Sequence, residues 1–205
     1  MLVQARGVAA RYPGDAAVLA ALAEAEYDAG NDAEAIAAAD AALALDPAQV
    51  NAYVQKGYAL FRRASDVEGE ERVAAYRAAV APFLALNKIE NDHPLPLMFF
   101  YRSFAERGTQ PPEQAVLGLR RAAELAPFDL GLRLTLATQQ MLSGELDEAR
   151  ANLVPVAYNP HGGDMAGGAR QVIERIDAGG EPAAEELLAL LVPSAPATGA
   201  ADGAQ

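Results

Sequence analysis

Apolar residues recur at helical spacing along this chain, in blocks separated by glycine and proline. Residues 16–47 show the pattern most clearly. The first half of this segment carries one apolar stripe, formed by Leu19, Leu22, Ala23 and Tyr27. After a break at Gly30, the second half carries another stripe, formed by Ala35, Ile36, Ala39, Ala42, Leu43 and Leu45. Because β-branched runs with a period of two are missing, the pattern predicts an all-α protein without a sheet.

Prolines at helix ends set a repeat of about 34 residues. Pro13 and Pro47 are 34 residues apart, and Pro94, Pro127 and Pro160 follow at spacings of 47, 33 and 33. Proline suits these places because it cannot continue a helix and restricts the residue before it. A helix-turn-helix pattern with this period is the length of a tetratricopeptide repeat (TPR).

Residues 16–47 resemble a TPR unit in more than length. Small residues stand where neighbouring helices of that family cross, at Ala23, Ala35 and Ala42, a glycine marks the turn, and Asp-Pro closes the segment. Larger side chains at the crossings would push the helices apart. The resemblance implies a right-handed superhelical solenoid of antiparallel helix pairs.

The same punctuation divides the rest of the chain. We expect an orphan helix at 2–12, units at 16–47, 48–94, 97–127 and 130–160, a closing helix at 164–178, an extra helix within 179–192 and a disordered tail at 193–205. The second unit is lengthened by an insertion at 65–71. Pro82 and Pro155 fall inside predicted helices, where an interior proline costs about 3 kcal/mol and favours a kink or a break.

The orphan helix occupies the place of the second helix of a pair, with no first helix before it. This indicates a chain cut from a longer protein, with a solitary capping helix as the alternative. An unpaired end also leaves apolar surface for self-association.

Charge and composition exclude several classes of partner. The formal net charge is -12, with -6 on residues 1–50, +1 on 51–127 and -7 on 128–205. This acidity argues against nucleic acid and anionic membrane surfaces, which are bound by lysine and arginine. No apolar stretch reaches the roughly 20 residues of a membrane span, and there is no cysteine for disulfides or thiolate metal sites. We expect a soluble protein, cytoplasmic if complete and periplasmic if it is a piece of an exported protein.

The sequence offers little for catalysis, and we expect no enzyme, cofactor or metal. The two histidines, His93 and His161, stand beside helix-closing prolines two repeats apart, too far to share a metal, and we assign them loop or capping roles. The glycine-rich stretch at 161–168 lacks the preceding strand and following lysine of a phosphate loop. Asp164 within it is expected to cap the closing helix.

In the TPR family, the first helices of the units line a concave groove. The resemblance therefore implies partner-binding positions at Tyr27, Asn51, Val54, Tyr58, Arg62, Met98, Tyr101, Arg102, Thr138 and Met141. Tyrosine and arginine are favoured at binding hot spots, whereas Phe61 is assigned to the core. Members that grip acidic chaperone tails use basic and amide residues where Ala20 and Glu24 stand here, so such a receptor is not expected.

A second resemblance covers residues 80–178. LNKIENDHP at 86–94, MFFYRSF at 98–104 and PVAYNPHGG at 155–163 look like the repeat tail of bacterial proteins that have an upstream zinc-peptidase-like domain. The first functional hypothesis is a scaffold that binds a peptide or helical segment of another protein. The alternative is a structural or regulatory C-terminal tail of a larger bacterial envelope enzyme, with contacts made in cis.

Overall fold

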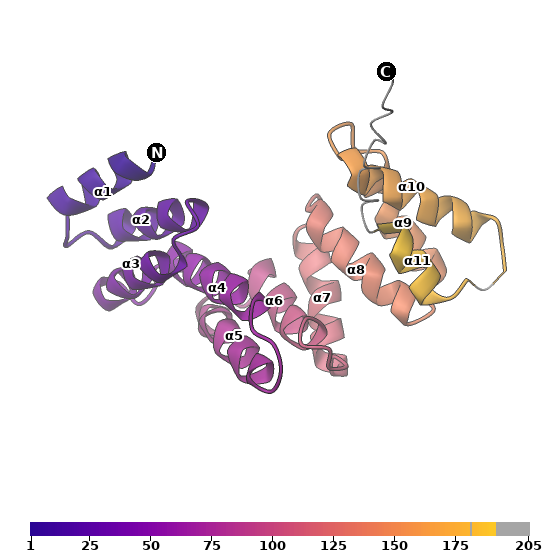
Figure 1. Ribbon diagram of the computed structural model, residues 1–205, viewed down its shortest axis with the longest axis horizontal. Helices are drawn as coiled ribbons and strands as arrows, with labels where there is room; N and C mark the ends of the chain where they lie inside the picture. The colour runs from indigo at the N-terminus through magenta and orange to yellow at the C-terminus, as the bar shows by residue number, and fades with distance from the viewer. Residues whose placement is uncertain (181, 192–205) are drawn as a thin grey trace, which may run out of the picture. The chain divides into compact units, whose positions relative to one another are not determined.

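The computed structural model describes residues 1–180 and 182–191, and every regular element within those residues is an α-helix (Figure 1). The chain begins with α1 (Leu2–Arg11), α2 (Ala16–Asp28), α3 (Asp32–Leu45), α4 (Val50–Ser65), α5 (Glu71–Ile89), α6 (Pro94–Ala105) and α7 (Glu113–Leu125). It continues with α8 (Leu130–Leu142), α9 (Leu146–Ala157), α10 (Gly163–Asp177) and α11 (Ala184–Leu191). The all-α prediction is confirmed. The tail predicted at 193–205 lies outside the described residues.

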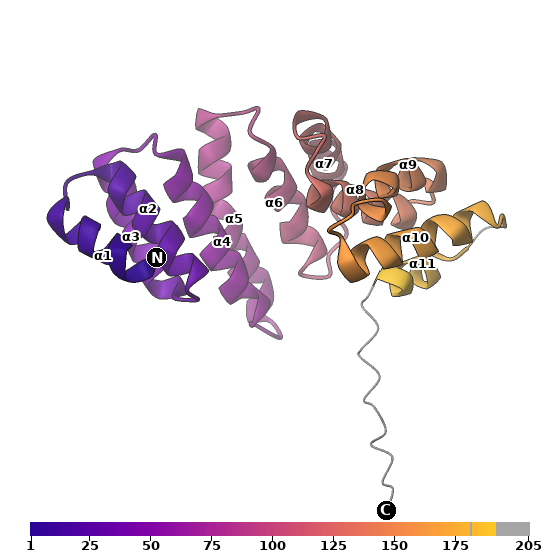
Figure 2. The same cartoon turned by 90° about the horizontal axis from the view of Figure 1, so that it is seen from above.

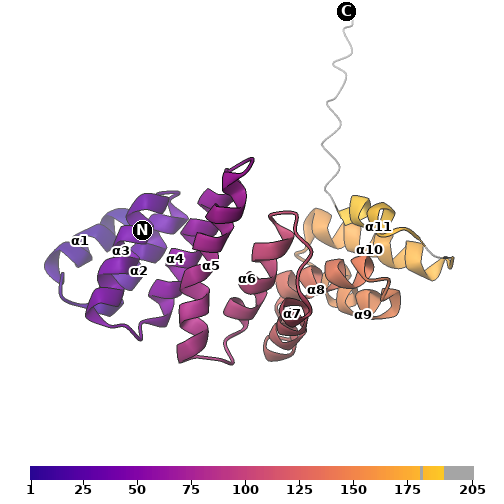
Figure 3. The same ribbon diagram turned by 90° about the horizontal axis from the view of Figure 1, so that it is seen from below.

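The helices form two compact units, Met1–Ala126 with α1 to α7, and a second from Pro127 onward with α8 to α11. In the first unit α2 pairs with α3, α4 with α5, and α6 with α7, and the pairs follow one another side by side (Figures 2 and 3). Within this unit the second helix of one pair also packs on the first helix of the next, as α3 does on α4 and α5 does on α6. We call α2, α4, α6, α8 and α10 the A helices, and α3, α5, α7 and α9 the B helices.

The first pair is held together by alanine. Ala23, Ala35 and Ala42, the residues expected at helix crossings, are fully buried. One buried cluster joins this pair to α4 and consists of Ala20, Ala23, Ala38, Ala39, Ala42 and Ala52, with Leu19, Leu22 and Leu43 partly buried around it. Methyl side chains allow the helix backbones to approach closely, because interiors pack at near-crystalline density.

The second pair has an aromatic core instead. Phe61, Tyr76, Phe83 and Phe99 form the centre of a buried cluster that joins α4, α5 and α6. Phe83 stacks on Phe99 with ring centroids 4.3 Å apart, and its other edge reaches the backbone of α4 at Gly57. A Cβ atom at Gly57 would lie 2.3 Å from the Phe83 ring. Glycine is therefore required here by close approach rather than by backbone conformation.

Helix α1 is attached to α2 through a buried carboxylate. Glu26 on α2 is 3% exposed. It accepts hydrogen bonds from Arg6 Nε and Nη2 at 2.6 and 2.8 Å and from Asn31 Nδ2 at 2.8 Å. These bonds, led by those from Arg6, hold the pKa of Glu26 below its ordinary value, although burial acts in the opposite direction. The contact fixes α1 against the start of the repeat array.

Neither interior proline breaks its helix. α5 continues through Pro82 and α9 continues through Pro155, so the expected break is absent. In each case the carbonyl left without a partner belongs to the residue four positions earlier, Ala78 or Ala151. Both of these residues are exposed, so water can hydrogen-bond to their carbonyls.

Two helix starts differ from expectation. α6 begins at Pro94, three residues before the expected start, because proline is accepted at the first helical position and His93 Nδ1 accepts a hydrogen bond from Leu95 N at 3.3 Å. The capping role of His93 agrees with the sequence. The cap expected of Asp164 is wrong: α10 is capped at Gly162, and Asp164 lies in its first turn, where its charge favours the helix dipole.

The second unit contains one complete pair, α8 with α9, followed by α10 and α11. α10 packs on α9 as α4 packs on α3, which identifies it as an A helix. The buried cluster of this unit draws on α8, α9, α10 and α11. None of the described helices in either unit is long and apolar enough to cross a membrane.

Candidate functional site

The A helices of the first unit bring aromatic and arginine side chains together around one small pocket of about 170 Å3. Its lining comes from α2, α4 and α6 and from residues just after α6. The lining residues are Tyr27, Tyr58, Phe61, Arg62, Ser65, Phe99, Arg102 and Glu106. We call this site the aromatic–arginine pocket.

Arg62 forms one wall of the pocket and ties three helices together. Its Nε lies 2.9 Å from Asp32 Oδ1, and its Nη2 donates to the Tyr27 carbonyl at 2.8 Å. The guanidinium also lies 4.0 Å from the centroid of the Tyr27 ring. Hydrogen bonding to Asp32 raises the pKa of Arg62 above its ordinary value, with burial opposing. The side chain is nevertheless 37% exposed, so a ligand can reach it.

Arg102 forms the opposite wall. Its guanidinium lies 4.8 Å from the centroid of the Phe99 ring and 5.9 Å from that of Phe61. It pairs with Glu106 four residues later and is 38% exposed. Cations over aromatic rings at such distances are stabilised by the ring quadrupole. Both arginines are thus held in place by a ring below and a carboxylate beside them.

The floor of the pocket is made of rings. Tyr58 lies 5.6 Å from Tyr27 and 5.4 Å from Phe99, and Phe61 lies 4.6 Å from Phe99. These separations are typical of aromatic pairs that stabilise one another. An apolar floor between two guanidinium groups suits a ligand with one apolar or aromatic side chain and a neighbouring carboxylate, because guanidinium binds carboxylate in a planar, two-pronged geometry.

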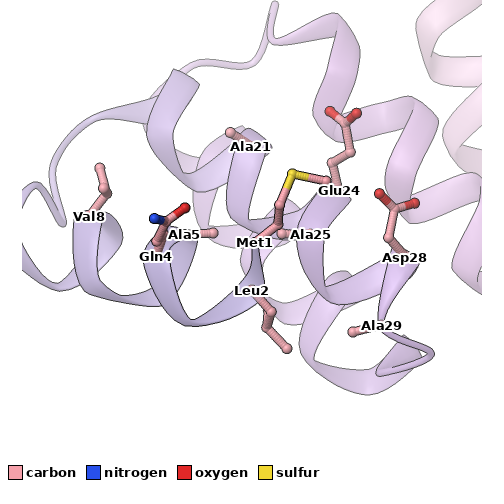
Figure 4. A pocket seen from close by; sticks show the side chains of 10 residues that line it. All are labelled: Met1, Leu2, Gln4, Ala5, Val8, Ala21, Glu24, Ala25, Asp28 and Ala29. Atoms are coloured by element: carbon pink, nitrogen blue, oxygen red, sulfur yellow. The ribbon is translucent and has the colours of Figure 1, made fainter.

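A second and larger hollow lies between α1 and α2, with a volume of about 530 Å3. Figure 4 shows Met1 and Ala25 near its middle and the carboxylates of Glu24 and Asp28 on the α2 side. One repeat of 34 residues later, the positions of Glu24 and Asp28 are taken by Tyr58 and Arg62, which contact Tyr27 of α2. The hollow therefore marks the surface on which a preceding A helix would pack.

Comparison with known proteins agrees with the hairpin arrangement. No family model matches the sequence, and no curated protein matches it. Solved structures do match: TTC0263, a thermophilic TPR protein of Thermus thermophilus, has a TM-score of 0.69 at 19% identity, over 83% of this chain and 87% of that one. The fold is that of a TPR protein. YrrB, a TPR protein with an unusual peptide-binding site, matches with a TM-score of 0.60 at 20% identity, over 91% and 90% of the two chains. MamA matches with a TM-score of 0.56 at 16% identity, over 85% and 86%.

These TPR structures support the first resemblance drawn from the sequence. The second resemblance, to repeat tails that follow a zinc-peptidase-like domain, is not confirmed by any of them and remains a prediction.

The TPR groove positions expected from the sequence separate into three groups. Tyr27, Tyr58, Arg62 and Arg102 meet at the aromatic–arginine pocket. Val54, Tyr101 and Met141 are buried at 8%, 3% and 2% exposure, so their side chains take part in helix packing. Burial also raises the pKa of Tyr101. The remaining three, Asn51, Met98 and Thr138, are half-buried and lie outside the pocket lining.

These three half-buried residues differ in their surroundings. Asn51 donates to Glu24 at 3.0 Å and accepts from Gln55 at 3.0 Å. Met98 packs against the aromatic cluster. Thr138 lies on α8, in the second unit. The assignment of these residues to a binding surface remains a prediction.

Sequence reasoning missed Phe99 and Glu106, which line the pocket. Phe99 and Arg102, three residues apart on α6, share a face and line the pocket together with residues of α4. Spacing from Arg102 would have found Glu106, because residues four apart on a helix are neighbours. Phe61, assigned to the core, is 5% exposed and also lines the pocket.

The described residues contain no group of three or more histidine, aspartate or glutamate side chains arranged to hold a metal ion. His161 is exposed at the turn before α10, and its backbone N donates to Asn159 Oδ1 at 3.0 Å.

Proposed function

We propose that this chain is a protein-interaction scaffold, and that the aromatic–arginine pocket anchors a peptide or helical segment of another protein. The observation that carries the proposal is the pair of exposed guanidinium groups of Arg62 and Arg102, each held over an aromatic ring on the same A-helix face. The TPR fold supports it, and the solved neighbour YrrB is described as having a peptide-binding site. The proposed role is binding without catalysis.

The chemistry of the pocket defines the ligand. The internal carboxylates of Asp32 and Glu106 already pair with the two arginines, so they show which group the guanidinium positions accept. A ligand carboxylate can share or replace these contacts while an apolar side chain covers Tyr58. The anchor we propose is therefore a hydrophobic or aromatic residue with aspartate or glutamate beside it.

Selection from a library of random displayed peptides tests this proposal on the full chain. We expect the enriched peptides to combine an apolar residue with an adjacent acidic one. Their affinity should fall about tenfold or more for Arg102→Ala, since a hydrogen bond to a charged group contributes about 1.5–3 kcal/mol. The ion-pair partner of Arg102 is Glu106, at the end of the same helix, so truncation of Arg102 should leave the fold intact. Arg62→Lys, which keeps the charge but loses the planar contact, should weaken binding less.

The matched control is Arg63→Ala. Arg63 follows Arg62 on α4 but is exposed and does not line the pocket. If the selected peptides bind the Arg102 and Arg63 variants with equal affinity, the pocket is not their binding site. If peptides are selected without an acidic residue, the assigned ligand chemistry is wrong.

The hollow between α1 and α2 supports a second candidate role, self-association. We propose that a helix of a second copy packs on Ala21 and Ala25, small residues at the place where a preceding A helix would lie. Sedimentation velocity at rising concentration should then show a dimer that Ala25→Glu disrupts. Ala33→Glu, at an exposed position of α3, should leave the dimer unchanged. A monomer at every concentration would exclude this role.

A further inference from the structure

Helix α11 does not occupy the place of a B helix. A B helix packs on its own A helix and on the next A helix, as α3 packs on α2 and α4. α11 follows the A helix α10, but it packs on α10 and on the preceding A helix, α8; Figures 2 and 3 both show it along α10. α9 already packs on the same two helices. Helices α8 and α10 therefore lie between α9 and α11. α9 covers one side of these two A helices, and α11 covers their other side, which we call the A-helix face.

The groove between α8 and α10 fits α11 closely. Leu187 is fully buried in one cluster with Met141 of α8 and Val172 of α10. At Gly168 of α10 the fit is tighter still, because a Cβ atom there would lie 2.5 Å from the Leu190 carbonyl oxygen. The groove thus has an apolar slot for a leucine and a point where only glycine admits the helix backbone.

An ion pair between α10 and α11 adds to this apolar fit. Arg175 of α10 pairs with Glu186, next to the buried leucine, with Nε 2.5 Å from Oε1. Guanidinium and carboxylate at this separation form a charge-assisted hydrogen bond. A helix that enters this groove is therefore recognised by a leucine and by an acidic residue one position before it.

α11 is a weak occupant of this groove. Its described part, Ala184–Leu191, has 8 residues, whereas α8 has 13 and α10 has 15. An isolated helix of this length is marginal in water, and at about 1.5 Å per residue it spans roughly 12 Å of a groove whose walls run for about 20 Å. Leu188, Leu190 and Leu191 are only partly buried against the cluster. A longer helix would bury more apolar surface in the same groove.

We propose that the α8–α10 groove is a binding site for an amphipathic helix of another protein, and that α11 occupies it in cis until such a helix displaces it. The partner helix carries a leucine at the position of Leu187, apolar residues at those of Leu190 and Leu191, and an acidic residue at that of Glu186. The segment before α11 contains Gly179 and Gly180, which both adopt positive φ, at 78° and 83°, and glycine has the widest choice of backbone conformations for a rearrangement. This site is in the second unit and does not depend on the aromatic–arginine pocket.

The first experiment follows undocking of α11 in the full chain with a single thiol. The chain has no cysteine, so Leu187→Cys gives one buried reporter whose reaction with a thiol reagent requires that α11 leave the groove. Gly168→Ala should accelerate this reaction about tenfold or more, because its Cβ meets the backbone of α11. Gly167→Ala is the matched control: it gives the same gain in helix propensity, but the nearest atom to its Cβ is Arg170 Nη2 at 3.9 Å.

The second experiment supplies the helix in trans. A fluorescent peptide of residues 178–191 should bind the full chain carrying Leu187→Asp, in which the cis helix is displaced. It should bind the natural chain about tenfold more weakly, because a tethered occupant at millimolar effective concentration competes with it. The same peptide with aspartate in place of the leucine should not bind, and adding Gly168→Ala, but not Gly167→Ala, to the Leu187→Asp chain should weaken binding.

Three results would overturn the proposal. Equal thiol reactivity of the Gly168 and Gly167 variants would show that α11 is a fixed part of the second unit. Absence of peptide binding to the Leu187→Asp chain, with its helical circular dichroism retained, would show that the groove does not accept a helix in trans. A natural chain that dimerises by exchanging α11 would show that the occupant is a second copy and not another protein.

Discussion

The contact between Gly57 and Phe83 offers a test of how the second pair is packed. Replacing Gly57 by alanine places a methyl group 2.3 Å from a ring carbon, whereas carbon atoms in contact lie about 3.5–4.0 Å apart. Phe83 is fully buried and stacked on Phe99, so the ring has no space to retreat. Overpacking of this kind costs about 1–3 kcal/mol, and we expect the upper end of that range.

The same substitution has an opposing local effect. Alanine is favoured over glycine inside a helix by about 1 kcal/mol, so the net loss of unfolding free energy for Gly57→Ala should be about 2 kcal/mol. In a chain that already carries Phe83→Leu, the ring is gone and only the helix-propensity gain remains. There, Gly57→Ala should stabilise the chain by up to about 1 kcal/mol.

Urea unfolding followed by circular dichroism measures both differences. The decisive quantity is the sign of the Gly57→Ala effect in the two backgrounds, because the pair should show a coupling of about 3 kcal/mol, the size seen for residues in direct contact. If Gly57→Ala has the same sign and size with Phe83 and with leucine at that position, the close approach does not limit this helix pair.

Two further predictions concern α1 and α9. Because the bonds from Arg6 hold the folded pKa of Glu26 below its unfolded value, their contribution is present above about pH 4.3 and is lost as the pH falls through the folded pKa. Arg6→Gln should therefore lower the urea midpoint at neutral pH and progressively less in acid, while Arg11→Gln, at an exposed residue of the same helix, should show no such pH dependence. Pro155→Ala should raise the unfolding free energy by up to about 3 kcal/mol in the same assay, since Pro155 is exposed inside α9 and loses no packing; a loss of stability would mean that this proline is needed for the shape of the helix.

Much of the fold could be predicted because the residues that mark the repeat have strong effects on the local backbone conformation. Pro13, Pro47, Pro127 and Pro160 all stand just after a helix end, as the repeat pattern predicts, and Ala23, Ala35 and Ala42 are fully buried where the pattern expects helix crossings. The TPR resemblance together with helical spacing selected Tyr27, Tyr58, Arg62 and Arg102, which meet at the pocket.

The sequence predictions failed where two local structures are equally favourable and tertiary packing decides between them. Pro94 ends one unit in the sequence pattern, but proline also starts helices, and α6 begins there. On this helix Phe99 lines the pocket, whereas Tyr101 is buried in the helix packing. Similarly, the sequence of the short leucine-rich helix α11 would allow it to pack on either side of α10. The decision depends on Gly168, which stands in a loop-like glycine run in the sequence although it admits the backbone of α11.

The alanine core of the first pair has a consequence for binding energetics. A buried methyl contributes about 0.8 kcal/mol, compared with about 1.5–3 kcal/mol for a large apolar side chain, so this pair gains less from its own packing than the aromatic pair beside it. In a linear array each repeat is stabilised by its neighbours, and the first pair packs on α4 and is joined to α1 by the Arg6–Glu26 contact. Tyr27 belongs to that pair, yet it forms part of the pocket. For the ligand proposed for this pocket, binding and the closing of the terminal repeat are therefore thermodynamically linked: whatever tightens the first pair should raise affinity, and a bound ligand should protect that pair from opening.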